Sequence, residues 1–168
     1  PYIFGDPALT WEWKQRMREI PGFRIGIAWQ GNPQHKGDRI RSIPLKTFAS
    51  IANIPGVKLI SLQKNKGVEQ IQELDGLFEL IDFKDIAEDS DGWLRTAAIV
   101  SNLDLVISAD TSVLHLCGAL GLPVCTAIST SPDWRWLLNR DDTPWYPTMQ
   151  LFRQSRQKDW EDVFGRIA

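Results

Sequence analysis

Short apolar segments that alternate with segments of helical spacing constrain the fold of this 168-residue chain more than any other feature. Six segments have the apolar character of buried strands: residues 23–29, 57–63, 77–83, 103–107, a segment containing Cys125, and 149–154. Capping residues or apolar spacing typical of helices occur before, between and after these strands. The expected helices are 7–19, 44–53, 67–74, 89–103, a segment containing His115, 132–139 and 158–168. This alternation predicts an α/β fold with a mostly parallel sheet covered by helices on both faces.

Six strands are the number found in a Rossmann-like, doubly wound domain. The pattern places this domain at residues 23–168, behind an N-terminal linker helix within residues 1–22 that begins at Asp6-Pro7. In such sheets, ligands bind at the carboxyl ends of the strands where the strand order reverses. With the common order 3-2-1-4-5-6, we expect the binding crevice between the first and fourth strands.

Composition excludes several classes of function. Hydrophobic residues make up 43% of the chain and charged residues 24%, and the net charge of −2 argues against a general nucleic-acid role. No apolar run approaches the roughly 20 residues that span a bilayer, and no signal peptide is visible. Cys117 and Cys125 match no metal motif and indicate reduced thiols in a cytoplasmic protein. Because the chain starts at Pro1 with no initiator Met, we expect it to be a fragment of a longer polypeptide, although trimming of a Met would give the same start.

A polar segment follows the fourth predicted strand. Asp110, Thr111 and Ser112 stand where this strand hands over to a helix, and His115 lies one turn into that helix. Free backbone N–H groups and the helix dipole suit a phosphate or pyrophosphate at such a position. Ordinary N-capping by the same residues explains the pattern about as well.

The loop after the first strand, residues 30–42, also reaches the expected crevice. It carries Lys36, Arg39 and Arg41 against Asp38, a local charge of +2. Such a loop closes over an anionic ligand or is simply a solvated surface loop. Other candidate contacts here are Trp29, Gln30 and Lys64, and His35 and Asp38 are weak candidates for acid–base catalysis.

Three tryptophans cluster after the fifth strand. Trp134 and Trp136 are candidates for stacking on a base or sugar. An equal alternative is that these rings and Trp145 pack the long loop onto the domain. No GxGxxG motif follows the first strand and no GxxxxGK[ST] loop occurs. The sequence therefore disfavours NAD binding and P-loop chemistry.

Four motifs together resemble a known family. "VISADTSVLHLCGALGLPV" is similar to the donor-site segment of the heptosyltransferase-like glycosyltransferases, family 9. "IGIAWQGNPQHKGDRIRSIPL", "SLQK" and "SPDWRWLLNRDDTPWYPTMQLFRQ" resemble segments of bacterial proteins that join tetratricopeptide repeats to such a domain. The likeness extends from about Phe23 to Ala168.

This resemblance implies the C-terminal, donor-binding half of a GT-B glycosyltransferase. It implies that Asp110, Thr111, Ser112 and His115 hold the diphosphate of a nucleotide sugar and its neighbouring groups, and that Lys64 offsets phosphate charge. Ser112 departs from the glycine frequent at that position. No metal or cofactor is expected, since cationic side chains and N–H donors can stabilise the charge on the leaving diphosphate. The general base and the acceptor wall are expected in the N-terminal half, so the fragment alone is expected to be inactive.

Two other functions stay open on the sequence. The chain can be a non-catalytic module that binds a sugar nucleotide for sensing or scaffolding. It can also belong to a GT-B-type epimerase that acts on the sugar nucleotide itself. No recognisable motif indicates the nucleotide base, the sugar, the acceptor or the oligomeric state.

Overall fold

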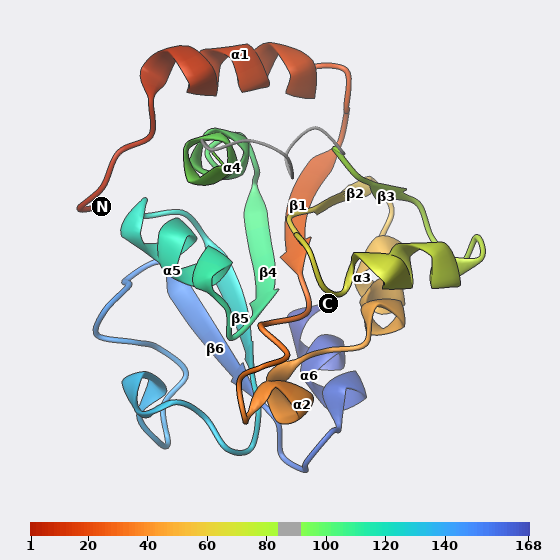
Figure 1. Cartoon of the computed structure of the whole chain (residues 1–168), viewed down its shortest axis with the longest axis vertical. Helices are drawn as coiled ribbons and strands as arrows, with labels where there is room; N and C mark the ends of the chain where they lie inside the picture. The colour runs from red at the N-terminus through yellow and green to blue at the C-terminus, as the bar shows by residue number, and fades with distance from the viewer. Residues whose placement is uncertain (84–91) are drawn as a thin grey trace.

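The computed structural model describes residues 1–83 and 92–168 and contains a six-stranded, all-parallel sheet. The strand order is β3-β2-β1-β4-β5-β6, so the order reverses between β1 and β4 (Figure 1). The strands are β1 (Phe23–Ala28), β2 (Val57–Ser61), β3 (Leu80–Ile81), β4 (Leu105–Ala109), β5 (Val124–Ile128) and β6 (Met149–Arg153). The predicted doubly wound fold, its six strands and their order are confirmed.

Helices cover both faces of this sheet (Figure 1). One face packs against α1 (Pro7–Met17), α4 (Gly92–Val100) and α5 (Ser112–Ala119). The other face packs against the 3-10 helix η1 (Leu45–Phe48), α3 (Ala49–Ala52) and α6 (Trp160–Ile167). Shorter elements are α2 (Asp38–Arg41) and the 3-10 helices η2 (Val68–Leu74) and η4 (Trp134–Trp136). No helix in the described part of the chain is long and apolar enough to cross a membrane.

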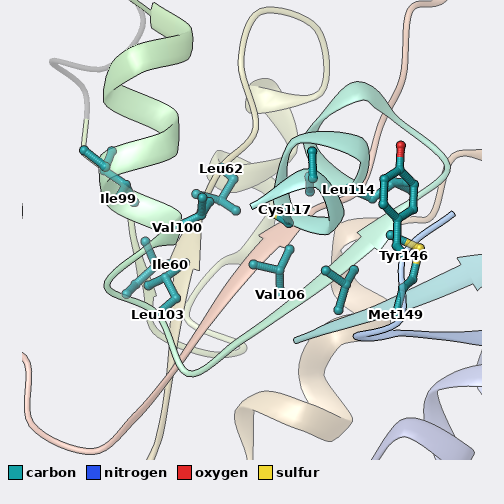
Figure 2. Packing of buried hydrophobic residues seen from close by; sticks show 14 of the residues in the cluster. Ile60, Leu62, Ile99, Val100, Leu103, Val106, Leu114, Cys117, Tyr146 and Met149 are labelled. Atoms are coloured by element: carbon teal, nitrogen blue, oxygen red, sulfur yellow. The ribbon is translucent and has the colours of Figure 1, made fainter. Parts of the chain in front are cut away.

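The alternation of side chains along β1 sorts residues between the two cores. Ile25, Ile27 and Trp29 enter the core beneath α3 and α6, whereas Ala28 enters the core beneath α4 and α5. Gly26 leaves room on the α4 and α5 side of the sheet, because an added Cβ would lie 2.5 Å from a methyl of Leu103. Figure 2 shows the core on this side, in which Leu62 and Leu103 pack with aliphatic residues of α4 and β4.

The N-terminal helix α1 contributes to the core. Asp6 caps it by accepting a hydrogen bond from the backbone N–H of Leu9 at 2.7 Å, and Pro7 begins it as the sequence predicts. Trp13 and Met17 are buried against the α4 side of the sheet. The division into a linker helix (1–22) and a domain (23–168) stays a prediction, but α1 is packed against the domain through these side chains.

Some local expectations are wrong in detail. The segments 44–53 and 67–74 are wholly or partly 3-10 helix rather than α-helix, and the third strand is reduced to Leu80–Ile81. The loop 30–42 contains the short helix α2. The helix predicted over 89–103 is observed as Gly92–Val100, and its expected first residues lie outside the described residues. The sequence also predicts a solvated acidic edge over residues 69–91, of which residues 84–91 lie outside the described residues.

Candidate functional site

An open cleft of about 1380 Å³ lies at the carboxyl ends of the central strands. Its walls come from the segments that follow four neighbouring strands: 30–33 after β1, 63–66 after β2, 110–113 after β4 and 129–133 after β5. This is the place where the strand order reverses, so the topology and the cavity agree on the location of a ligand site.

The N-terminus of α5 opens into this cleft without a side-chain cap. Thr111 is the N-cap residue in extended conformation, yet no side chain accepts a hydrogen bond from the first turn. The Ser108 hydroxyl donates to the carbonyl of Ala109 at 2.7 Å, so the hydroxyl of Thr111 is the donor in its 3.2 Å contact with Ser108. The first-turn N–H groups of α5 therefore retain their capacity for an anion, and the alternative of ordinary side-chain capping is not what the geometry shows.

His115 lies one turn further along α5, at the same cleft. Its Nδ1 is 3.0 Å from the hydroxyl of Tyr146, and its ring stacks on Trp136 with centroids 5.4 Å apart and planes at 14°. Burial lowers the pKa of His115 below its ordinary value, against an opposing effect of Asp110. The imidazole is therefore neutral at pH 7 and acts as a hydrogen-bonding group rather than as a cation.

Lys64 follows β2 and reaches across to the start of α4. Its Nζ donates to the Gly92 carbonyl and to the Thr96 hydroxyl, both at 2.9 Å, and the side chain lines the cleft. Burial, with a smaller effect of Arg95, lowers the pKa of Lys64 from 10.5. An ammonium group has three donors, so one remains for a ligand in the described structure.

Gln63 organises the floor of the cleft. Its side-chain oxygen accepts from the backbone N–H groups of Trp29 at 3.0 Å and Gln30 at 2.9 Å. Its amide nitrogen donates to the carbonyls of Gln30 and Lys66 at 2.9 and 2.8 Å. Gln63 was not among the predicted site residues, because a single glutamine at a strand end has no pattern that distinguishes it from a solvated side chain.

The basic loop contributes only part of what the sequence predicts. Gln30, His35 and Arg41 line the cleft, whereas Arg39 is exposed and does not line it. Asp38 is buried and pairs with the guanidinium of Arg41 at 3.5 Å, and it too is outside the cleft lining. Among the weak catalytic candidates only His35 faces the cleft, and its Nδ1 accepts the N–H of Gly37 at 3.1 Å.

The three candidate tryptophans, Trp29, Trp134 and Trp136, do not line the cleft. Trp29 is fully buried and its indole N–H donates to the carbonyl of Gly67 at 3.0 Å, because the strand alternation of β1 turns it away from the cleft. Trp136 is fully buried beneath His115. Trp134 is 68% exposed but lies outside the cleft lining, edge-on to Trp145.

The lining residues that were not predicted as site residues include Asp133, Arg135 and Tyr146. Asp133 caps η4 by accepting from the N–H of Arg135 at 3.0 Å and pairs with the guanidinium of the same residue at 2.8 Å. All three come from the long segment after β5, whose path over α5 is decided by packing rather than by a local motif.

The described residues bear on two further kinds of chemistry, metal binding and thiol reactivity. Within residues 1–83 and 92–168, no three His, Cys, Asp or Glu side chains are grouped so as to hold a metal ion. Burial raises the pKa of Cys117 to about 12 and that of Cys125 to about 11. Both thiols are therefore protonated and unreactive at neutral pH.

Comparison with known proteins gives one relative by sequence. No family model matches the chain. Protein FlbA of Caulobacter vibrioides is 28% identical over 173 residues, and the alignment covers 99% of this chain but 28% of FlbA. The chain thus corresponds to less than a third of that relative.

Solved glycosyltransferase structures share the fold. ADP-heptose LPS heptosyltransferase II of E. coli matches with a TM-score of 0.69 and 12% identity over 99% of this chain, and a family 9 glycosyl transferase of Veillonella parvula matches with 0.64 and 13% over 98%. The E. coli heptosyltransferase WaaC with ADP matches with 0.59 and 13% over 99%. The chain spans 52%, 46% and 48% of these proteins, about half of each. Its fold is that of one half of a GT-B heptosyltransferase.

Proposed function

We propose that this chain is the donor-binding half of a glycosyltransferase and that its cleft holds a nucleoside diphosphate sugar. The observation that carries the proposal is the uncapped N-terminus of α5 at the reversal of strand order, with His115 one turn away. The heptosyltransferases that share the fold, one of them solved with ADP, support the same class of ligand.

The diphosphate is placed at the first turn of α5. Its oxygens accept from the backbone N–H groups there, from the hydroxyl of Ser112 and from His115, while Lys64 supplies positive charge. The hydroxyl of Thr111 joins these donors by turning its single proton away from Ser108. Asp110 is a carboxylate and repels phosphate, so we assign it to hydroxyl groups of the sugar or ribose, from which it accepts hydrogen bonds.

The proposed reaction is glycosyl transfer. An acceptor oxygen forms a bond to the anomeric carbon of the sugar as the bond from that carbon to the diphosphate oxygen breaks. The diphosphate leaves with the electron pair, and the acceptor proton passes to a base. The contribution of this half is to stabilise the negative charge that develops on the leaving diphosphate, through the helix N-terminus and Lys64.

A non-catalytic sugar-nucleotide-binding module is the second candidate. It is favoured by the state of the two acid–base candidates, since Asp38 is buried in an ion pair and His35 Nδ1 is occupied by a backbone N–H. Under the first proposal the base comes from the partner half of the GT-B fold. Turnover of a matched donor and acceptor by a two-domain protein containing this chain distinguishes the two, because a binding module gives none.

Direct binding tests the site. We expect ADP, UDP or GDP, or one of their sugars, to raise the melting temperature of the chain and to bind in calorimetry. His115→Ala is expected to weaken that binding by about 1–3 kcal/mol, the value of a hydrogen bond to a charged group. Trp11→Ala, which alters an exposed residue of α1 outside the cleft lining, is the control and is expected to bind as wild type. Equal affinity of His115→Ala for every nucleotide would remove His115 from the site.

A further inference from the structure

The imidazole of His115 is held between two aromatic rings. Trp136 stacks on it, with planes at 14°, and Tyr146 lies tilted against it with centroids 5.7 Å apart and planes at 58°. Trp136 is fully buried and Tyr146 is 9% exposed, so neither ring has room to leave. The orientation of the histidine is therefore set by its surroundings before any ligand binds.

A glycine in α5 makes the seat for Tyr146. A Cβ added to Gly118 would lie 2.4 Å from Cγ and 2.6 Å from Cδ1 of the Tyr146 ring. Gly118 follows His115 by three residues, so the two lie on the same face of α5. The absence of a side chain at 118 thus lets the tyrosine ring lie flat against the helix, within reach of the imidazole. Figure 2 shows Tyr146 beside α5 with its oxygen directed away from the aliphatic core.

The hydroxyl of Tyr146 is 3.0 Å from Nδ1 of His115. A neutral imidazole carries its proton on one nitrogen, and the hydrogen bond made by the other nitrogen decides which. Burial raises the pKa of Tyr146 to about 12, so this phenol keeps its proton at neutral pH. Nε2 is the ring nitrogen that has no protein partner in the described structure.

We propose that Tyr146 is the positioning residue of this site: its hydroxyl donates to Nδ1 of His115, which fixes the imidazole as the neutral form protonated on Nε2. This inference rests on the proposed function in one respect, that the Nε2–H then donates to the diphosphate. The seat at Gly118 and the stack on Trp136 hold the pair in place.

Charged groups from other elements also face the histidine. Asp110, after β4, and Asp133, after β5, favour its protonated form, whereas Arg135 and the larger effect of burial disfavour it. The hydrogen bond from Tyr146 favours the neutral imidazole, as burial does, because a hydroxyl can donate to Nδ1 only when that nitrogen has a free lone pair.

Tyr146→Phe tests the direction of this hydrogen bond. The change removes the hydroxyl and keeps the ring that packs on Gly118. Nitrogen-15 NMR of the imidazoles reports the tautomer and the pKa without any nucleotide, and the chain has two histidines, so His115→Gln assigns the signals. We expect wild type to show His115 protonated on Nε2 and Tyr146→Phe to show a higher pKa for His115. A proton on Nδ1 in wild type, or an unchanged or lower pKa in the variant, would overturn the proposal.

Gly118→Ala tests the seat of the tyrosine. The added methyl must displace the Tyr146 ring, so the variant is expected to change the tautomer population and pKa of His115 as Tyr146→Phe does. The matched control is Gly165→Ala in α6, where an added Cβ meets nothing within 4 Å. If Gly118→Ala fails to fold, Tyr146→Phe alone still decides. Tyr2→Phe removes the phenol next to Tyr146 and is expected to keep the Nε2–H tautomer.

Nucleotide affinity separates this inference from the proposed function. If a nucleoside diphosphate binds, Tyr146→Phe is expected to weaken it by about 2- to 12-fold, the range for one neutral hydrogen bond, with a steeper loss toward acidic pH. If no nucleotide binds any variant while the NMR result is as expected, the proposed function fails and the positioning role of Tyr146 stands. If Tyr146→Phe leaves the tautomer and pKa of His115 unchanged while wild type binds a nucleotide, the positioning role of Tyr146 fails and the proposed function stands.

Discussion

At the residue scale, the two basic side chains of the site differ in what burial does to them. Burial lowers the pKa of both His115 and Lys64. For His115 the decrease starts from an ordinary value of 6.5, which keeps the ring neutral at pH 7, whereas for Lys64 it starts from 10.5. Histidine therefore serves as a neutral donor here and lysine as the cation.

The lowered pKa of His115 predicts a pH dependence of stability. The unfolded chain takes up this proton at a higher pH than the folded protein, so acidification below about pH 6.5 favours unfolding. The stability contributed by the neutral ring is complete above that pH and is lost as the pH falls toward the folded value. We expect the free energy of unfolding of His115→Gln, measured in urea, to decrease less than that of wild type between about pH 7 and pH 5. His35→Gln, at the exposed histidine, is the control, and identical profiles for wild type and His115→Gln would contradict the prediction.

Lys64 is expected to carry part of the salt dependence of ligand binding. Exposed charges are screened over about 8–10 Å at ordinary ionic strength, so the affinity for a diphosphate should fall as salt rises. Lys64→Met is expected to weaken binding and to flatten this dependence, as measured by calorimetry at two salt concentrations. Lys46→Met, at an exposed lysine outside the cleft, should retain the wild-type slope. Wild-type affinity of Lys64→Met at low salt would show that the lysine only ties β2 to α4.

At the scale of elements, α1 is the helix whose role the sequence describes least well. It packs on α4, and the helix presents two tryptophans of opposite exposure: Trp13 is 2% exposed and Trp11 is 65% exposed. Trp13 also makes an edge contact with Phe83, with centroids 5.1 Å apart. Helix α1 thus belongs to the core through one face only.

This difference gives a matched pair of substitutions. Trp13→Ala is expected to lower the free energy of unfolding by about 3–5 kcal/mol, the cost of removing a buried aromatic ring. Trp11→Ala is expected to change it by less than about 0.5 kcal/mol, since a surface substitution loses little packing. Denaturant unfolding of both variants measures this. Similar small effects would mean that residues 1–22 act as the linker the sequence indicates.

At the scale of the whole molecule, the sheet with helices on both faces forms two cores within one chain. Such a unit has what it needs to fold alone. Glycosyl transfer, in contrast, requires donor and acceptor held at reacting distance. The chain spans about half the length of the glycosyltransferase structures it matches, and one half of a GT-B fold forms one wall of the crevice.

We therefore expect the chain to unfold cooperatively, to bind a nucleoside diphosphate, and not to transfer sugar. A side-by-side assay of the chain and of a two-domain protein containing it, with a matched donor and acceptor, measures this. Transfer by the chain at a rate near that of the larger protein would place the base in this half, with His35 as the first residue to replace.

The sequence by itself determined the sheet and the place where its strand order reverses. Strand and helix patterns repeat locally, and right-handed crossovers between parallel strands leave few possible orders, so residues 110–115 could be assigned to the switch point without coordinates. Only the tertiary structure decided which side chains enter the cleft. The alternation of side chains along β1 buries Trp29 instead of directing it into the cleft. Packing of the segment after β5 buries Trp136 and brings Tyr146 to His115. Gln63, at the end of β2, holds the loop after β1 by hydrogen bonds. These contacts join residues 31 to 34 positions apart, and no local pattern records such a pairing because it depends on how whole elements pack.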